Sequence, residues 1–314
     1  MKVWMRTLTV TFTSKALKKS MTFGNNYKED KPDLNIDVQG YKYMSTLKDA
    51  CTIRISNLTY NEIVQLIQGQ FYDVEVKAGY RSIGEFTIFK GGVLYISNSL
   101  GDRKTNTAII LCASDLVAKY GQSRLNLTLN SGINLYSAIN FICKRAGVPN
   151  TNISTQFKKQ FLKDIANVNN TAGSWIDNLC NNNQNYITNT DGGTNSSFSI
   201  YDASKSNSRI LKLNSNNVEI VGGSPQLTND GLTFSLMPTL NLMCGDVIQI
   251  DNSIISIAVE SQEEVKKNYG YYLDKEGMYT IYQIKYNLQN RGSNFSYNIV
   301  AKSRSLISNI TGGK

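Results

Sequence analysis

The chain has 314 residues, of which 41% are hydrophobic and only 18% charged, with a formal net charge of +9 and no histidine. This length allows two or three domains, and the hydrophobic content excludes a disordered protein. The lack of histidine excludes a Ser-His-Asp or Cys-His catalytic arrangement and any zinc site that uses histidine.

The first third of the chain predicts a small antiparallel β-barrel with one helix. Apolar and polar residues alternate from Thr7 to Thr13, which is typical of a half-buried strand. Thr59 followed by Glu62 is a capping-box pattern and predicts a short helix that stops at Gly69. Further strands are expected at 34–38, 51–55, 74–76, 85–90, 93–97 and 107–113.

A glycine pair and an apolar segment predict two further features of this first third. The Gly91-Gly92 pair predicts a turn between the strands at 85–90 and 93–97. The segment Thr107 to Ala113 is nearly all apolar, so we expect it to be buried on both faces.

The middle of the chain changes from strand to helix periodicity. The strand pattern of residues 125–129 is followed by apolar residues at helical spacing, with Gly147 as the stop. Two more helices are predicted, and a short strand follows at 198–202. The apolar residues that indicate the three helices are Leu135, Ile139 and Ile142, then Phe157, Phe161, Ile165 and Val168, then Trp175, Ile176, Leu179 and Cys180.

From Val218 onwards the pattern is β again. Asn229-Asp230-Gly231 predicts a hairpin turn, and Pro238 breaks the chain before a strand that ends at Ile250. A final hairpin is expected from the alternation over 282–288 and 295–301. The charged stretch Glu260–Glu276 is an exposed loop or, alternatively, a contact loop.

These patterns predict an α+β, mainly β chain with two small antiparallel β-barrels flanking a helical α+β insert. The expected domains are residues 1–123, residues 124–217 and residues 218–314. The positive charge is scattered rather than clustered with aromatic residues, which favours a solvated face or a match to an acidic neighbour over nucleic-acid binding. The low charged fraction suits either an assembled β-rich protein or a biased genome composition.

The sequence indicates neither secretion nor a redox or metal function. No signal peptide and no apolar stretch long enough to span a membrane is apparent, so we expect the protein to stay in the cytoplasm unless a larger particle carries it out. The five cysteines are odd in number and widely spaced, and are expected to be reduced and buried. They are Cys51, Cys112, Cys143, Cys180 and Cys244.

No motif for catalysis is present. Carboxylate pairs could serve a cell-wall glycosidase, but the candidate acids lie in no distinctive motif and are expected to be surface residues. They are Glu62, Glu75, Glu85, Asp115 and Asp202. Trp4 and Trp175 could stack on sugars, although aromatic residues in such patterns are more often in the core. We therefore expect no enzyme, catalytic residue, cofactor or metal.

Three blocks, in order, resemble the hub family of bacteriophage tails, which includes late control protein D, baseplate hubs and the hub part of type VI secretion spikes. The first is Val76-Lys77-Ala78-Gly79-Tyr80 with Ile88 to Val93, and the second runs from Ser131-Gly132-Ile133 to Ala146-Gly147-Val148. The third runs from Gly223-Ser224-Pro225-Gln226 through Pro238 to Ile250, followed by Gly277-Met278-Tyr279 and the last hairpin.

The resemblance implies a structural protein with two tail-tube-like β-barrels and a helical insert. In that family a trimer presents six similar barrels in a ring, which joins the sixfold tail tube to the threefold spike. The implied partners are two more copies of the chain, the tube, spike and other baseplate proteins, with genomic DNA as a cargo through the lumen. The implied location is the virion tail, assembled in the host cytoplasm.

Several residues are candidates for assembly contacts on this reading. They are Tyr80, Phe89, Pro225, Pro238, Tyr269, Tyr271 and Tyr272. No lysozyme-like or peptidase region is visible, so the resemblance implies no cell-wall activity. The alternatives are another tail protein, of the distal-tail or tube type, and, with less support, a carboxylate-dependent cell-wall glycosidase.

Overall fold

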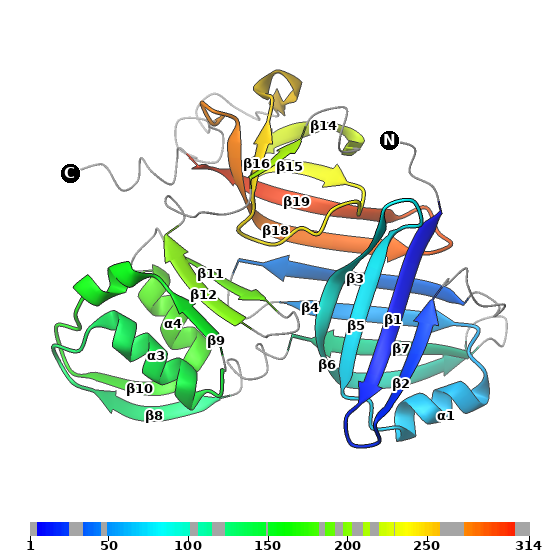
Figure 1. Cartoon of the computed structure of the whole chain (residues 1–314), viewed down its shortest axis with the longest axis horizontal. Coiled ribbons are helices and arrows are strands. Elements are labelled where there is room, and N and C mark those ends of the chain that lie inside the picture. Colours follow the sequence, from blue (N-terminus) through cyan, green and yellow to red (C-terminus); the bar gives the residue numbers. More distant parts are fainter. Residues whose placement is uncertain are drawn as a thin grey trace.

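A computed structural model describes most of the chain (Figure 1). The described residues are 5–24, 34–44, 49–100, 106–114, 123–148, 150–181, 186–191, 197–202, 210–213, 220–228, 230–257 and 273–304. Strands predominate over helices among them, so the fold class is α+β and mainly β, as expected.

The first third contains seven strands and one helix, followed by the strands and helices of the insert and then the last strands. The elements up to residue 113 are β1 (Arg6–Ser14), β2 (Lys19–Gly24), β3 (Asn35–Tyr43), β4 (Ala50–Ser56), α1 (Tyr60–Gln68), β5 (Asp73–Tyr80), β6 (Gly84–Leu100) and β7 (Asn106–Ala113). Those of the insert are β8 (Arg124–Leu129), α3 (Leu135–Arg145), β9 (Asn150–Ile153), η1 (Thr155–Lys159), β10 (Ala166–Thr171), α4 (Ala172–Asn181), β11 (Tyr186–Asp191) and β12 (Ser197–Asp202). The remainder are β13 (Ile210–Leu213), β14 (Ile220–Thr228), β15 (Gly231–Leu236), β16 (Val247–Ile250), η3 (Asn252–Ile254), β17 (Ser256–Ile257), β18 (Met278–Gln289) and β19 (Phe295–Ser303).

One 14-stranded sheet joins the two ends of the chain. Its main order is β17-β14-β15-β19-β18-β3-β4-β7-β6-β5-β1-β2, with β16 on β18 and β13 on β16. The link is the antiparallel pair of β3 and β18, in which Asp37 lies opposite Gln289 and Tyr43 opposite Gln283. Buried residues of both ends form a single hydrophobic cluster. The first and last thirds of the chain are therefore built around one continuous core.

The local sequence signals of the first third produce the expected elements. Leu8, Val10 and Phe12 are fully buried on one face of β1, because alternate residues of a strand face the same side. Helix α1 begins at the capping box, in which the Thr59 side chain accepts from the Glu62 N–H and the Glu62 carboxylate accepts from the Thr59 N–H. Figure 1 shows α1 at one end of this lobe, beside the β1–β2 hairpin.

The expected turn at Gly91-Gly92 is wrong, because β6 continues through both glycines as one long strand. Gly92 lies opposite Asp73 of β5 and also opposite Ala113 of β7. The first half of β6 thus pairs with β5 and the second half with β7. A Cβ atom at Gly91 would collide with the carbonyl oxygen of Ala113, so the crossing requires glycine.

The expectation that residues 107–113 are buried on both faces is also wrong. Ala108, Ile110 and Cys112 face the core, whereas Leu111 is 41% exposed and Ile109 is half-buried. The strand belongs to an antiparallel sheet whose outer face is uncovered here, and an apolar sequence cannot reveal that.

The last third follows the predicted order of strands. Strands β14 and β15 form a hairpin that returns at Gly231, and Asn229 of the predicted turn lies outside the described residues. Pro238 falls between β15 and β16, and β18 pairs with β19 around residues 290–294. Most of the stretch Glu260–Glu276 also lies outside the described residues.

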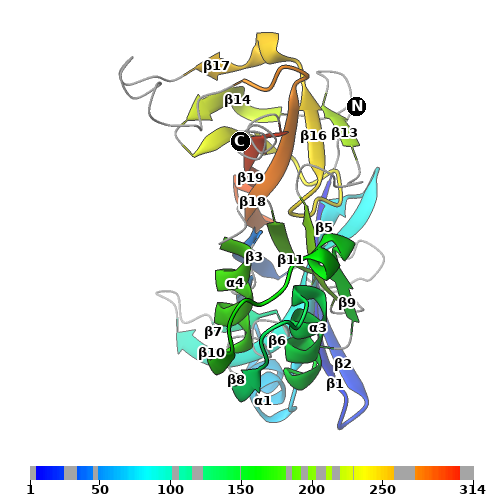
Figure 2. The same ribbon diagram turned by 90° about the vertical axis from the view of Figure 1, so that its left-hand side faces the viewer.

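The insert has a hydrophobic core of its own. Figure 2 shows its helices α3 and α4 beside the short strands of the insert. Strands β8 and β10 form one small sheet, and β11, β12 and β9 form another, with α3 and α4 packed between the strands. The first and third predicted helices correspond to α3 and α4.

The second predicted helix of the insert is wrong. Phe157 is buried in the single turn η1 and Val168 is buried in β10, but Phe161 and Ile165 are 58% and 65% exposed. The segment from Gln160 to Leu162 is instead hydrogen-bonded to the start of α3 and to the residues just before it. Leu135 donates its N–H to the carbonyl of Gln160, at 2.8 Å. The regular spacing of four apolar residues was therefore not a buried stripe.

Candidate assembly surfaces

The seam between β3 and β18 fixes how the two ends of the chain meet. Tyr286 of β18 is buried and lies opposite Gly40, and its hydroxyl donates to the carbonyl oxygen of Ala50, at 3.4 Å. The position where a Cβ of Gly40 would stand is occupied by the Tyr286 ring and hydroxyl. Glycine at this position thus lets an aromatic ring of the last third enter the core of the first.

A second set of contacts holds the last hairpin against the first strand. Arg6 of β1 donates to the carbonyl of Gly292, at 2.6 Å, and its guanidinium lies over the ring of Phe295. Tyr80 packs edge-on against Phe295 with ring centroids 5.4 Å apart. The Asn290 side chain donates to the carbonyl oxygen of Leu34, just before β3, and accepts from the N–H of Ile36 in β3. The seam is therefore held at several separate points.

Three buried thiols and a buried phenol surround this seam. Cys51 and Cys112 are cross-strand partners facing the core, and Cys244 is also buried. Burial raises the pKa of the Cys51 thiol to about 12 and also raises the pKa values of Cys112, Cys244 and Tyr286. Neutral buried thiols are unreactive, so the expectation of reduced, buried cysteines is confirmed at these positions and at Cys143. The side chain of Cys180 lies outside the described residues.

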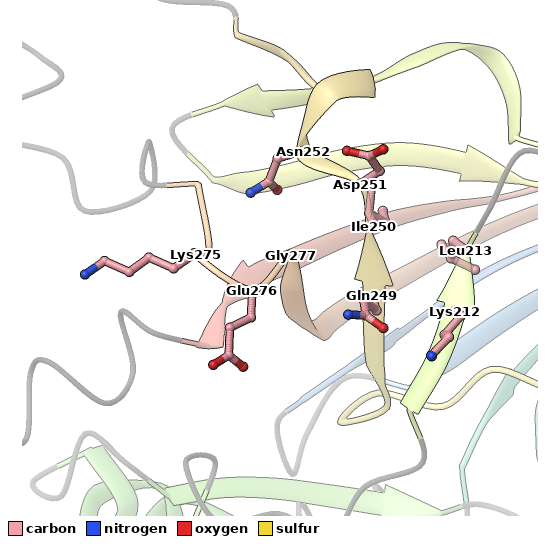
Figure 3. A pocket seen from close by; sticks show the side chains of 9 residues that line it. All are labelled: Lys212, Leu213, Gln249, Ile250, Asp251, Asn252, Lys275, Glu276 and Gly277. Carbon is pink, nitrogen blue, oxygen red and sulfur yellow. The ribbon is translucent and has the colours of Figure 1, made fainter.

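A hollow with charged side chains lies at the end of the last third, where a space of about 450 Å³ is bounded by β13, β16 and the turn before β18 (Figure 3). Its charged side chains do not converge. Figure 3 shows Lys275 and Asp251 pointing away from each other, with Lys212 on a third side. Without convergent groups the hollow has no arrangement for binding a small ligand.

A hydrogen-bonded network around Asp274 supports this end of the molecule. The buried carboxylate accepts from the Met278 N–H and from the Ser303 hydroxyl, at 3.0 Å each. The Asp274 N–H donates to the Tyr279 hydroxyl, which donates to the side-chain oxygen of Asn252. These bonds hold the turn that begins at Asp274 against β18 and β19, so the role of Asp274 is structural.

A second hollow lies on the outer face of the sheet, under an arch of β14. Between Val221 and Gln226 this strand has four residues where β15 has only Phe234. Gly222 and Gly223 adopt positive φ angles of 82° and 114°, which a residue with a side chain rarely adopts. The arch leaves a space of about 360 Å³, lined by hydroxyl and amide side chains together with apolar residues, two glycines and Lys285.

The sheet has a free edge along the second half of β6. Residues 93–100 pair with β7 on one side and, within the described part of the chain, have no strand on the other. Leu94 is 60% exposed and Tyr95 58% exposed at this edge, next to a bulge between Val93 and Tyr95. Near one end of the strand order, β17, of two residues, is the one described strand on the outer side of β14. An exposed apolar edge of this kind invites pairing with another chain.

The predicted contact residues lie elsewhere. Tyr80 and Phe89 are buried in the common core, and Pro225 and Pro238 are also buried. Because these four side chains are buried, they could affect assembly only by fixing the position of the backbone, and their role in assembly remains a prediction. Tyr269, Tyr271 and Tyr272 lie outside the described residues.

Sequence reasoning missed Leu94 and Tyr95. A signal was present, because Val93, Leu94, Tyr95 and Ile96 are four consecutive apolar residues, which a strand with one uncovered face cannot bury together.

The candidate catalytic acids have structural partners where they are described. Glu62 caps α1, Glu75 accepts from the Thr87 hydroxyl, and Glu85 accepts from the Thr9 hydroxyl. The described residues contain no group of three acids or cysteines placed to hold a metal. Trp175 packs against the core of the insert. Trp4, Asp115 and the side chain of Asp202 lie outside the described residues.

No helix of the described residues has both the length and the apolar character needed to cross a bilayer.

Residues 16–261 match the sequence profile of the family described as Baseplate hub gp41. No curated protein sequence is significantly similar to the chain.

Several solved structures share the fold. The 43 kDa tail protein of prophage MuSo2 from Shewanella oneidensis has a TM-score of 0.58 and 8% identity, covering 95% of this chain and 97% of that one. A tail protein from Neisseria meningitidis has a TM-score of 0.56 and 6% identity, covering 97% and 98%. The E. coli protein c3393 has a TM-score of 0.53 and 9% identity, covering 88% and 75%. It is described as a type VI secretion component structurally similar to the T4 tail proteins gp27 and gp5.

Proposed function

Because the chain belongs to the Baseplate hub gp41 family, we propose that it forms a trimeric ring joining the sixfold tail tube of a bacteriophage to its threefold spike. As a member of that family it is a phage tail and baseplate component. The ring, the spike junction and the passage of DNA are the proposed part.

The continuous sheet is the observation that supports the ring most directly. Strands of the first and last thirds lie side by side in it. Residues 93–100 of β6 leave an edge free among the described strands, and β14, near one end of the strand order, is covered by the two-residue β17. Two different edges on one molecule suit a head-to-tail contact, which closes into a ring when the rotation between copies allows it. In this ring residues 1–123 and 218–314 are two tube-like barrels, and residues 124–217 are the insert between them.

The outer face of the sheet suits a lumen. Ser296, Asn287, Gln39 and Thr52 stand side by side on β19, β18, β3 and β4. This row consists of hydroxyls and amides. The flanking rows of the same face add one exposed cation each, Lys285 on one side and Arg54, opposite Asp37, on the other, so the face has few of the Lys and Arg side chains that hold phosphates. We propose that this face lets DNA pass as cargo without retaining it or reading its sequence.

The proposed partners are two further copies, the tail tube protein, the spike protein and other baseplate proteins. The proposed location is the virion tail, after assembly in the host cytoplasm. We assign no catalytic residue and no cofactor, and the glycosidase alternative has no support in the positions of Glu62, Glu75 and Glu85.

The ring is tested by placing a charge on the free edge. Leu94→Lys should abolish or sharply reduce trimer formation, because a lysine on an open strand edge opposes edge-to-edge pairing. The measurement is light scattering coupled to size exclusion, with negative-stain images of the ring. Leu17→Lys, at the exposed turn between β1 and β2, is the matched control and should leave the trimer intact.

Two outcomes would overturn the proposal. One is a wild-type protein that stays monomeric both alone and with its virion partners. The other is a sixfold ring, which would identify a tube or distal tail protein instead.

A further inference from the structure

The insert carries an exposed surface that the ring does not use. It is formed by the outer side of α3 and by the segment from η1 to Ile165, and we refer to it as the insert surface. Between Leu135 and Ile165 the chain has five basic residues and one acidic residue, Asp164. The basic residues are Lys144, Arg145, Lys158, Lys159 and Lys163, all exposed.

The two basic segments lie at opposite ends of α3, so the helix places both on one surface although they are separate in sequence. The chain from Gln160 to Leu162 is hydrogen-bonded to the start of α3. Lys158 lies over the ring of Tyr136, with its ammonium 5.0 Å from the ring centroid. At the other end of α3, Arg145 lies over the ring of Phe141 at 5.4 Å. An 11-residue helix is about 16 Å long, so the charges extend over that length.

The helix presents one face outward for its whole length. Ala138, Ile139 and Ile142 turn into the insert core, and the opposite side exposes Ser137, Phe141 and Lys144. Phe161 and Ile165 are also largely exposed. The insert surface thus combines apolar side chains with cations.

The cations are not neutralised within the described part of the chain. Neither of the salt bridges formed there, Lys15 with Asp73 and Lys77 with Glu75, involves the insert. Five cations with one neighbouring carboxylate attract negative charge, and exposed Phe and Ile side chains gain free energy when an apolar surface covers them.

We propose that the insert surface docks an acidic, apolar-containing segment of another protein. A protein partner is favoured over nucleic acid on account of Ile165, which is aliphatic and packs against a partner side chain but cannot stack on a base. Phe141 and Phe161 suit either partner, and the DNA probe below separates the two. The surface lies outside the sheet edges proposed to form the ring, so this inference does not depend on the trimer.

The test compares three probes at low and physiological salt by fluorescence anisotropy. They are a labelled peptide in which glutamate alternates with leucine and phenylalanine, a polyglutamate peptide of equal charge, and single-stranded DNA of equal charge. The variant is Lys159→Glu/Lys163→Glu. Its matched control is Lys18→Glu/Lys19→Glu, which makes the same charge change at another exposed site. Circular dichroism melting verifies that both variants remain folded.

The mixed peptide should bind most tightly and lose about tenfold or more in affinity with the insert variant but little with the control. Ile165→Ser should weaken the mixed peptide and leave polyglutamate unchanged, since only the former offers apolar side chains.

Three results would overturn the proposal. Equal losses with the insert variant and the control would indicate general charge attraction. Tighter binding of the DNA, lost with the insert variant, would make this a nucleic-acid surface. Failure of all three probes to bind at low salt would show that the surface docks no acidic ligand.

Discussion

Gly40 is the residue on which the seam between the two ends of the chain depends. We expect Gly40→Ala to destabilise the protein by about 1–3 kcal/mol, because the new methyl would overlap the Tyr286 ring and the Ala50 carbonyl in a packed core. Urea unfolding followed by circular dichroism measures the loss.

Gly292→Ala is the matched control, at the turn after β18. The atoms nearest to a Cβ there belong to the Gln289 side chain, which can move aside. Its cost should be clearly smaller. Equal costs for the two variants would contradict the role given to Gly40.

The buried thiols predict a loss of stability in alkali. The unfolded chain releases the Cys51 proton above its ordinary pKa of 9.0, whereas the folded chain holds it until about pH 12. The unfolded state therefore binds fewer protons between these values, and the free energy of unfolding falls as pH rises. At pH 10 the Cys51 contribution alone is roughly 1.4 kcal/mol.

The measurement is the urea midpoint at pH 7 and pH 10 in the presence of a reductant. Cys51→Ala should show a smaller drop between the two pH values than the wild type. An unchanged drop would mean that Cys51 ionises equally well in both states.

The sequence could indicate which residues are buried, but not the role of each one. Tyr80 and Phe89 were predicted as assembly contacts; both side chains lie in the core, and their part in assembly stays a prediction. The sequence also predicts a turn at Gly91-Gly92. Glycine is needed there because Ala113 lies too close, and Ala113 is distant in sequence. A close approach of this kind leaves no local signal.

At the scale of elements, α1 depends on its first turn. Thr59→Ala should cost about 1 kcal/mol, because it removes the oxygen that accepts from the Glu62 N–H. Thermal unfolding measures the change. Asn61→Ala, exposed in the same turn, is the control and should have little effect. A similar loss from both would show that the cap contributes nothing specific.

Elements with an internal signal were predictable from the sequence, and those defined by a neighbour were not. Alternation identified β1 and the β18–β19 hairpin, and the capping box identified α1. The failure at residues 157–168 has a physical reason. Phe161 and Ile165 satisfy helical spacing but are exposed, and the backbone between them is held by the start of α3.

For the whole molecule, the two separate cores predict two unfolding transitions. Phe157→Ala should lower the free energy of unfolding of the insert by about 3–5 kcal/mol and leave that of the other core nearly unchanged. Tyr286→Leu should destabilise the large core and leave the insert nearly unchanged. In a Trp4→Phe background, fluorescence of Trp175 follows the insert alone, and far-ultraviolet circular dichroism follows the strands of the whole chain.

A single transition shifted equally by both substitutions would contradict independent cores. It would also count against the proposed division at residues 124 and 217.

The pairing of β3 with β18 was beyond sequence reasoning at this scale. Each strand alternates clearly, but alternation carries no information on which strand lies beside it. The β, α+β, β order predicts two barrels but does not indicate that a strand of the first third pairs with a strand of the last. The continuous sheet depends on contacts such as Asn290 to Leu34, between residues at opposite ends of the chain.

The pairing of β3 with β18 can form only late in the synthesis of the chain. About 235 residues separate the end of β3 from the start of β18. At a ribosomal rate of about 5–20 residues per second, β3 waits roughly 10–50 s for its neighbour to be made. During that interval its edge is open to other nascent chains, and Asp37 and Lys42 are the charges on it that discourage such pairing. Yield in the infected cell should therefore depend on translation speed and chaperone supply more than the stability of the finished protein suggests.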